Sequence, residues 1–127
     1  MNLVVDTNIL SDFFKAEAKA TTTITKAAKV YVPAIVIGEY KYGIYGGTRR
    51  KHNLELLNGF LAKSNVLVAE INAVTAEHYG QLRAYLRANG TPIPVNDIWI
   101  SALCVQFDLP LLTRDHDFNY LPQVERI

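Results

Sequence analysis

The amino-acid sequence predicts an α/β fold, with a mostly parallel central sheet flanked by helices on both faces. Short apolar runs rich in branched residues alternate along the chain with longer stretches of helical spacing, as they do in parallel sheets with helical crossovers. Two of these runs, residues 3–5 and 110–112, are solidly apolar. Because such runs are typical of strands that are covered on both sides, three layers of helix, sheet and helix are expected.

Each predicted element follows from a local pattern. Pro33 is expected at the first position of a helix, where proline is tolerated, and Gly46 and Gly47 are expected to end that helix. The clearest amphipathic helix has Val74 on its apolar side and ends at Gly90. The predicted strands span residues 2–5, 30–32, 65–70 and 109–113, and the predicted helices span residues 7–15, 16–29, 33–45, 48–63, 73–89 and 97–107.

Length and composition favour a single domain that covers residues 1–127. A hydrophobic fraction of 50% suffices for a core, and a net charge of +1 gives no general attraction to nucleic acid or membranes. The single cysteine, Cys104, excludes an internal disulfide and fits a reducing compartment. No signal peptide is visible, and no apolar run approaches the roughly 20 residues of a membrane span. A cytoplasmic protein without a membrane partner is therefore expected.

Four acidic residues fall where a predicted strand ends or where the following helix begins. Asp6 directly follows the first strand, and Asp115 follows the last strand by two residues. Asp97 opens a helix after a proline-rich loop, and Glu39 lies in the early part of the helix after the second strand. Because ligands of open parallel sheets bind outside the carboxyl ends of the strands, we expect these four side chains to share one crevice.

Each acid also has a purely structural interpretation. Asp6 and Asp97 could cap helices, and Asp115 could belong to a polar loop. Glu39 is harder to explain in this way, because its helix looks mostly buried and a buried carboxylate is costly unless it is paired. Four converging carboxylates raise one another's pKa values unless a cation neutralises them. An all-oxygen ligand set favours Mg²⁺ or Mn²⁺, whose bound water suits hydrolysis.

Four segments, "VVDTNIL", "EYKYG", "PVNDIWISA" and "LLTRDHDF", occur in this order along the chain. Together they resemble the PIN-domain ribonucleases, and most of all the VapC-type toxins of toxin–antitoxin pairs. The resemblance covers nearly the whole chain and implies a PIN-like three-layer fold. It also implies an Mg²⁺- or Mn²⁺-dependent endoribonuclease that hydrolyses RNA, a homodimer, and a cognate antitoxin protein that inserts a segment to block the site.

The same resemblance assigns roles to individual residues. It makes Asp6, Glu39, Asp97 and Asp115 the catalytic and metal-binding acids, and it makes Asn8 and Thr113 polar supports of the site. Asp117 competes with Asp115 for the last acidic position, since two residues spaced by two in strand geometry share a face.

Two other functions are compatible with parts of the sequence. In a phosphatase with an aspartate nucleophile, Asp6 would attack phosphate after the first strand, but such enzymes typically need a second aspartate where this chain has Asn8. A non-catalytic PIN-fold module for binding or dimerisation would not need the four acids, all of which are present.

Aromatic and basic residues add weaker signals. Tyr40, Tyr42 and Tyr45 could stack nucleic-acid bases, but the helical spacing of the last two favours a core or dimer surface. The basic residues at 48–52 fit either a phosphate contact or a solvated helix start. Arg114 is the best placed single cation, because it neighbours Asp115.

Overall fold

The computed structural model of the protein describes residues 1–127 and confirms the predicted α/β architecture. Its four strands form one sheet in the order β3–β2–β1–β4, and every pairing is parallel. The strands are β1 (Asn2–Val5), β2 (Lys29–Pro33), β3 (Val66–Ala69) and β4 (Leu111–Leu112). The helices are α1 (Thr7–Phe14), α2 (Ala18–Lys26), α3 (Ala34–Tyr45), α4 (Arg50–Leu61), α5 (Ala73–Ala88) and α6 (Val95–Phe107), followed by a short 3₁₀-helix, η1 (His116–Tyr120).

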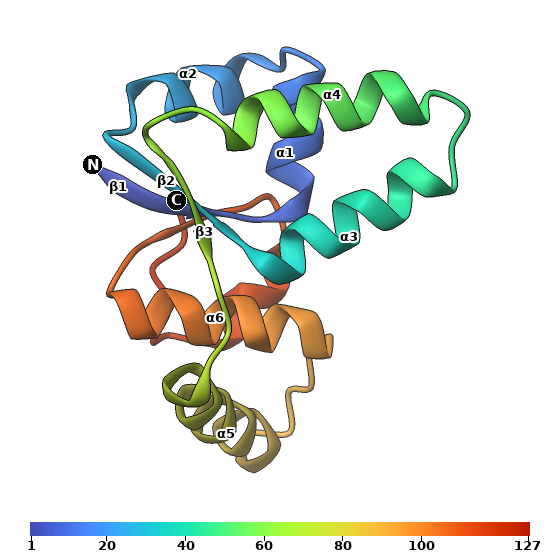
Figure 1. Cartoon of the computed structure of the whole chain (residues 1–127). Helices are drawn as coiled ribbons and strands as arrows, with labels where there is room; N and C mark the ends of the chain where they lie inside the picture. The colour runs from blue at the N-terminus through green and yellow to red at the C-terminus, as the bar shows by residue number, and fades with distance from the viewer.

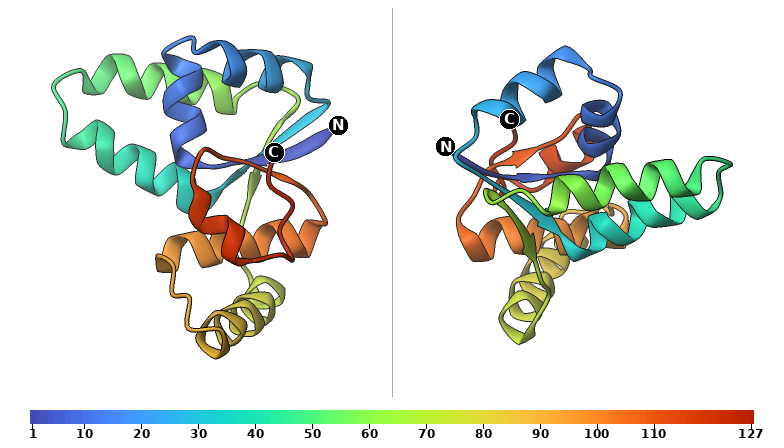
Figure 2. Two further views of the ribbon diagram at one scale, coloured as in Figure 1. Left: turned by 180° about the vertical axis from the view of Figure 1, so that it is seen from behind. Right: turned by 45° about the horizontal axis from the view of Figure 1, so that its top comes forward.

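Helices cover both faces of the sheet, as predicted. On one side lie α1, α2 and α4, whereas α6 lies on the other side with α5 packed outside it (Figure 1). The pair α3 and α4 projects away from the sheet and is joined at its outer end by a short loop, which is visible from both directions in Figure 2. No helix has the length and apolar character that a membrane span requires.

The sheet is built around β1, whose side chains Leu3, Val4 and Val5 are fully buried. In its register, β1 places Val4 opposite Tyr31 of β2 and Val5 opposite Leu112 of β4. Since the strands run in one direction, their carboxyl ends lie at the same edge of the sheet. The loops and helix starts that carry chemistry must therefore gather at that edge.

Several details differ from the sequence-based expectation. Pro33 is the last residue of β2 and precedes α3, rather than opening the helix. The strand predicted at 109–113 shrinks to two residues, because the segment from 113 onward turns into η1. Val74 is 55% exposed, although it was expected on the buried side of its helix. It lies in the first turn of α5, outside the part of that helix that buries Leu82 and Leu86.

The helix α3 departs most clearly from its predicted environment. Its composition is strongly apolar, yet only Val36 and Ile44 are buried. The reason is geometric, because α3 leaves the sheet and projects into solvent beside α4 (Figure 1). By contrast, Cys104 of α6 is buried and Trp99 stacks on Tyr79 of α5 with 4.0 Å between ring centroids, so both are packing residues.

Candidate active site

The structure brings the predicted acids together at the carboxyl edge of the sheet. Asp6 directly follows β1, Asp97 lies in the first turn of α6, and Asp115 immediately precedes η1. Oxygen atoms of Asp97, Asp115 and Asp117 all lie within 4.8 Å of one another. Asp6 and Glu39 lie outside this trio but are linked to it, because Thr113 contacts both Asp6 and Asp115 and Thr7 contacts both Asp6 and Glu39.

Asp6 is held by a dense set of hydrogen bonds. The backbone N–H of Thr7 donates to its Oδ1 at 2.8 Å, while the Thr113 hydroxyl and the Asn8 amide donate to its Oδ2 at 2.7 and 3.1 Å. The Thr113 oxygen in turn accepts the backbone N–H of Asp115 at 2.9 Å. Burial raises the pKa of Asp6, and the hydrogen bonds from Thr113 and Thr7 oppose the rise. The three donors together hold its carboxylate in one orientation.

Asp97 lies in a different environment, although it belongs to the same edge. Its side chain is 8% exposed, and no protein group donates a hydrogen bond to its carboxylate. Burial first, and then the neighbouring charges of Asp6, Asp115, Glu39 and Asp117, together raise its pKa from 3.8 to about 7. An acid in this position holds its proton near neutral pH unless a positive charge is supplied.

No basic side chain forms a salt bridge with Asp97 or with the acids beside it. The one salt bridge of the chain joins Arg114 to Asp12, with Nε at 2.6 Å from Oδ2, and a second nitrogen of Arg114 donates to Oδ1 at 3.1 Å. The guanidinium of Arg114 thus lies against α1, and a phosphate contact by Arg114 stays a prediction. A cluster of carboxylate oxygens from one buried and two half-buried aspartates, without a salt-bridge partner, fits a hard divalent cation.

Glu39 occupies a more open part of the same site. The hydroxyl of Thr7 donates to its Oε1 at 2.8 Å, which links α3 to the start of α1. Glu39 is only half-buried and faces a cavity of about 640 Å³, lined by Thr7, Ile35, Gly38, Glu39, Tyr42 and Asn96. The expectation of a mostly buried helix around Glu39 is therefore wrong, and its carboxylate has access from solvent.

Asp115 and Asp117, the two candidates for the last acid, lie close together, but not through the strand geometry that was predicted. Asp115 and Asp117 do not lie in a strand, because the chain turns into η1 at this point. The backbone N–H of Asp117 donates to Asp115 Oδ1 at 2.9 Å, so Asp115 caps the short helix while both carboxylates face Asp97. The choice between them for the catalytic role stays a prediction.

The capping interpretations have opposite outcomes for Asp6 and Asp97. Asp6 does cap α1, so it combines a structural role with its position in the acid group. Asp97 caps nothing, since α6 begins at Val95 after Pro94 without a side-chain cap. The hydroxyl of Ser101 donates to the backbone carbonyl of Asp97 at 2.8 Å, and being fully buried it is not available to a substrate.

Sequence reasoning missed two contributions to this edge. Asn96 and Ile35 line the cavity beside Glu39, and only the tertiary structure places them there.

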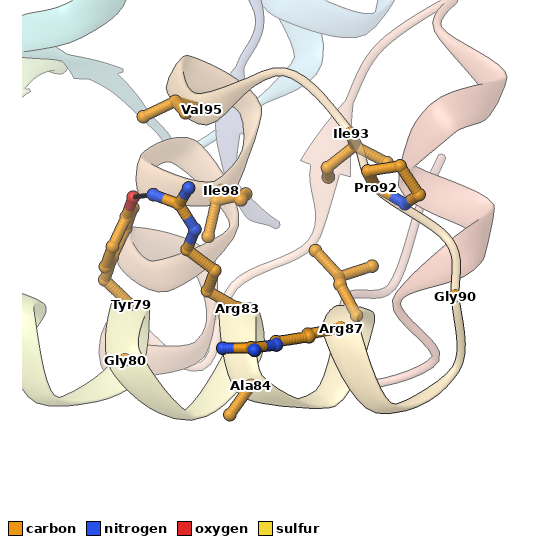
Figure 3. A pocket seen from close by; sticks show the side chains of 11 residues that line it. Tyr79, Gly80, Arg83, Ala84, Arg87, Gly90, Pro92, Ile93, Val95 and Ile98 are labelled. Atoms are coloured by element: carbon orange, nitrogen blue, oxygen red, sulfur yellow. Dashed lines mark hydrogen bonds between the residues drawn. The ribbon is translucent and has the colours of Figure 1, made fainter.

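A separate cavity of about 740 Å³ lies between α5 and α6 and has Arg83 and Arg87 in its wall (Figure 3). No acidic residue lines that second cavity, so it is distinct from the acid group.

The fold and the acid group agree with a known family. The PIN domain family matches residues 3–123, and the chain therefore belongs to the PIN domain family. Within it, the chain is similar to the VapC proteins. It is 27% identical to "Ribonuclease VapC4" of Mycobacterium tuberculosis, over 76% of this chain and 74% of that protein. It is 28% identical to the "tRNA(fMet)-specific endonuclease VapC" of Salmonella typhimurium, over 76% and 73%.

Solved structures show the same architecture. The VapBC2 complex of Rickettsia felis, crystallised with a DNA fragment from its promoter, contains a chain that matches with a TM-score of 0.89 and 24% identity, covering 100% of this chain and 98% of that one. The DNA-bound VapBC of Salmonella typhimurium matches with a TM-score of 0.86 and 25% identity, covering 100% and 97%. The three-layer PIN-like fold expected from the sequence is thereby confirmed.

Proposed function

We propose that this protein is a metal-dependent endoribonuclease that hydrolyses RNA phosphodiester bonds, and that it is the toxin of a toxin–antitoxin pair. The observation that carries the proposal is the group of Asp97, Asp115 and Asp117 carboxylates at the carboxyl edge of a PIN sheet, in which Asp97 is buried and accepts no hydrogen bond. Similarity to proteins named ribonuclease and endonuclease supports the reaction. We further propose that residues 1–127 form one PIN domain.

The acidic residues of the site are the proposed metal ligands. Asp6, Glu39, Asp97 and Asp115 would hold Mg²⁺ or Mn²⁺, with Asp117 as a further ligand beside Asp115. When bound, the ion would polarise a phosphoryl oxygen of the RNA and lower the pKa of a water molecule.

Two hydroxyl groups orient the proposed ligands. Thr113, together with the amide of Asn8, holds the carboxylate of Asp6, and Thr7 holds that of Glu39, so two of the four acids are held in place by the protein itself. Asp97 is the acid that must lose its proton for binding, because its pKa lies near 7 without a cation. The affinity for metal should therefore rise with pH through this range.

The proposed partners rest on similarity. The matching solved structures are VapBC assemblies, which supports a cognate antitoxin protein as a partner of this chain. RNA as substrate, a homodimer and a cytoplasmic location complete the proposal. An antitoxin segment that enters the acid site would block access to it, as the family resemblance implies.

The phosphatase alternative gains no support from the site. Asn8, at the position where a second aspartate would be needed, donates its amide to Asp6 and so acts as a positioning group. Both oxygens of Asp6 already accept hydrogen bonds, which leaves its carboxylate less free for nucleophilic attack.

The test uses a matched pair of variants in one helix. Purified protein is incubated with RNA and Mg²⁺ or Mn²⁺, and Asp97→Asn is compared with Asp108→Asn. Asp108 is exposed at the far end of α6 and has a positive φ of 53°, which asparagine adopts readily. Cleavage should stop in Asp97→Asn and on chelation, and it should persist in Asp108→Asn. Equal cleavage by both variants would contradict the proposal.

A further inference from the structure

The three tyrosines of α3 have three different environments. Tyr40 packs on Phe14 with 5.5 Å between ring centroids, so it belongs to the protein interior. Tyr45 is 52% exposed near the end of the helix. Tyr42 is 84% exposed, which excludes a role in the core for this large aromatic side chain. The proposed nuclease chemistry does not use it either.

Tyr42 lies beside the acid site. It follows Glu39 by three residues, which at 1.5 Å per residue is about 4.5 Å along the helix axis. Both side chains line the same cavity of about 640 Å³, and Asn96 of α6 contributes to the lining. A planar ring held against Tyr42 would thus lie beside Glu39, one of the proposed metal ligands.

The chemistry of the cavity indicates an uncharged, planar ligand with a polar edge. No basic residue lines it, and Glu39 gives it negative charge, so it does not suit a phosphate by itself. Gly38 leaves open space, because no atom lies within 4 Å of the position that a Cβ would occupy there. The carboxamide of Asn96 can donate and accept hydrogen bonds, as the edge of a nucleobase requires.

We propose that Tyr42 and Asn96 form a nucleobase-binding subsite, in which the Tyr42 ring stacks on the base next to the scissile phosphate and Asn96 hydrogen-bonds to the edge of that base. The proposal rests on RNA hydrolysis at the acid site and adds how the strand is positioned there. Single-stranded RNA is recognised in this way, by stacking unpaired bases on aromatic side chains and reading their edges.

The first experiment separates binding from cleavage. In the Asp97→Asn background, affinity for a short single-stranded RNA is measured by fluorescence anisotropy for Tyr42→Ala, Tyr42→Phe and Tyr45→Ala. Tyr42→Ala should weaken binding about tenfold, the usual size of a lost base–aromatic stack. Tyr42→Phe keeps the ring and should bind as before. Tyr45→Ala removes the same side chain one turn further along α3 and should also bind as before.

The outcomes distinguish this subsite from the proposed nuclease activity. Unchanged affinity of Tyr42→Ala, or an equal loss in Tyr45→Ala, overturns the subsite even when the unaltered protein cleaves RNA. Absence of both cleavage and RNA binding in the unaltered protein instead overturns the nuclease. If Tyr42→Ala changes the oligomeric state in sedimentation and leaves RNA affinity intact, Tyr42 belongs to a protein interface and the subsite is also overturned.

Kinetics and fluorescence distinguish RNA binding by Tyr42 from a purely structural role of this side chain. In the cleaving protein, Tyr42→Ala should raise KM about tenfold and leave kcat unchanged, since stacking holds ground state and transition state alike. In Tyr42→Trp, RNA should quench the fluorescence of the introduced indole. The only native tryptophan, Trp99, is stacked on Tyr79, so its emission should not respond to a base bound at position 42. Lack of quenching at saturating RNA contradicts stacking.

Asn96 is tested by base preference. Oligonucleotides that differ only in the base beside the cleaved bond should bind the unaltered protein with different affinities, and Asn96→Ala should reduce that difference about tenfold. A preference that survives Asn96→Ala unchanged removes Asn96 from the subsite.

Discussion

Asp6 and Asp97 lie at the same edge of the sheet, but their carboxylates are held in opposite ways. Asp6 receives three hydrogen bonds from Thr7, Asn8 and Thr113. Asp97 receives none, although it is almost as buried, and its pKa rises to about 7. The difference teaches that hydrogen bonds offset part of the cost of burying the Asp6 carboxylate, whereas no hydrogen bond offsets that cost for Asp97.

The largest expected effect is on catalysis, where substitution of Asp6 and substitution of Asp97 should lower the cleavage rate to a similar extent. Asp6→Asn and Asp97→Asn should each lower the rate of RNA cleavage at least a thousandfold, which corresponds to about 4 kcal/mol of transition-state stabilisation. Single-turnover cleavage with saturating Mn²⁺ measures this loss. A variant that retains a tenth of the rate would remove that acid from the proposed site.

Stability should separate the same two variants. In chelator at pH 7.5, Asp97→Asn should raise the free energy of unfolding by about 1 kcal/mol, because it removes a repelled, buried charge. Asp6→Asn should lower the free energy of unfolding by roughly 1–2 kcal/mol, because asparagine has one acceptor oxygen where Asp6 uses two. Urea denaturation measures both, and changes of equal sign would contradict the comparison.

Asp115 and Asp117 offer a second comparison within the acid group. The charge of Asp115 raises the pKa of both Asp6 and Asp97, and the charge of Asp117 raises the pKa of Asp97. We therefore expect Asp115→Asn to weaken Mn²⁺ binding about a hundredfold and Asp117→Asn about tenfold, the range found for ligands and their supports. Titration of Mn²⁺ followed by electron paramagnetic resonance decides the order, and a reversed order would make Asp117 the fourth acid.

The side chain of Thr113 links Asp6 to Asp115. Its buried hydroxyl donates to Asp6 and accepts from the backbone of Asp115. Thr113→Val keeps the shape but leaves these partners unsatisfied, so it should cost about 2 kcal/mol of unfolding free energy. Thr113→Ser retains the hydroxyl and serves as the control, with an expected loss well below that of valine. Similar losses in both variants would show that packing of the methyl group matters more than the hydrogen bonds.

The smallest expected effect is the pH dependence of the metal-free protein. The pKa of Asp97 is about 7 in the folded state and 3.8 in its ordinary range, so the folded state binds the proton more tightly. Stability is thus highest below pH 4 as far as this group is concerned, and it falls as pH rises toward 7. Between pH 5 and 7.5 we expect a loss of about 1–2 kcal/mol, shared among the coupled acids.

Chemical denaturation at a series of pH values in chelator measures this slope. Asp97→Asn should flatten it, and saturating Mn²⁺ should reverse it, because a cation favours the ionised carboxylates. An equally steep slope in Asp97→Asn would assign the effect to other groups, such as the three histidines.

Local patterns were sufficient to predict most elements. All four strands and six helices occur where the sequence predicted them, with bounds that shift by a few residues. The environments of these elements were less predictable. The burial expected for α3 was wrong, because apolar composition does not reveal that a helix projects beyond the sheet. The strand expected around Asp115 was wrong, because that acid caps a turn of its own.

The sequence by itself determined that acids follow parallel strands and so gather at one edge of the sheet. This was possible because the alternation of strand and helix is encoded in local periodicity, and parallel strands share the direction of their ends. Only the tertiary structure decided which acids are hydrogen-bonded and which are left for a cation. The Thr113–Asp6 bond joins residues 107 positions apart, and Tyr42 becomes exposed through the path of α3. Such contacts depend on how the crossovers pack, and no short stretch of sequence contains that information.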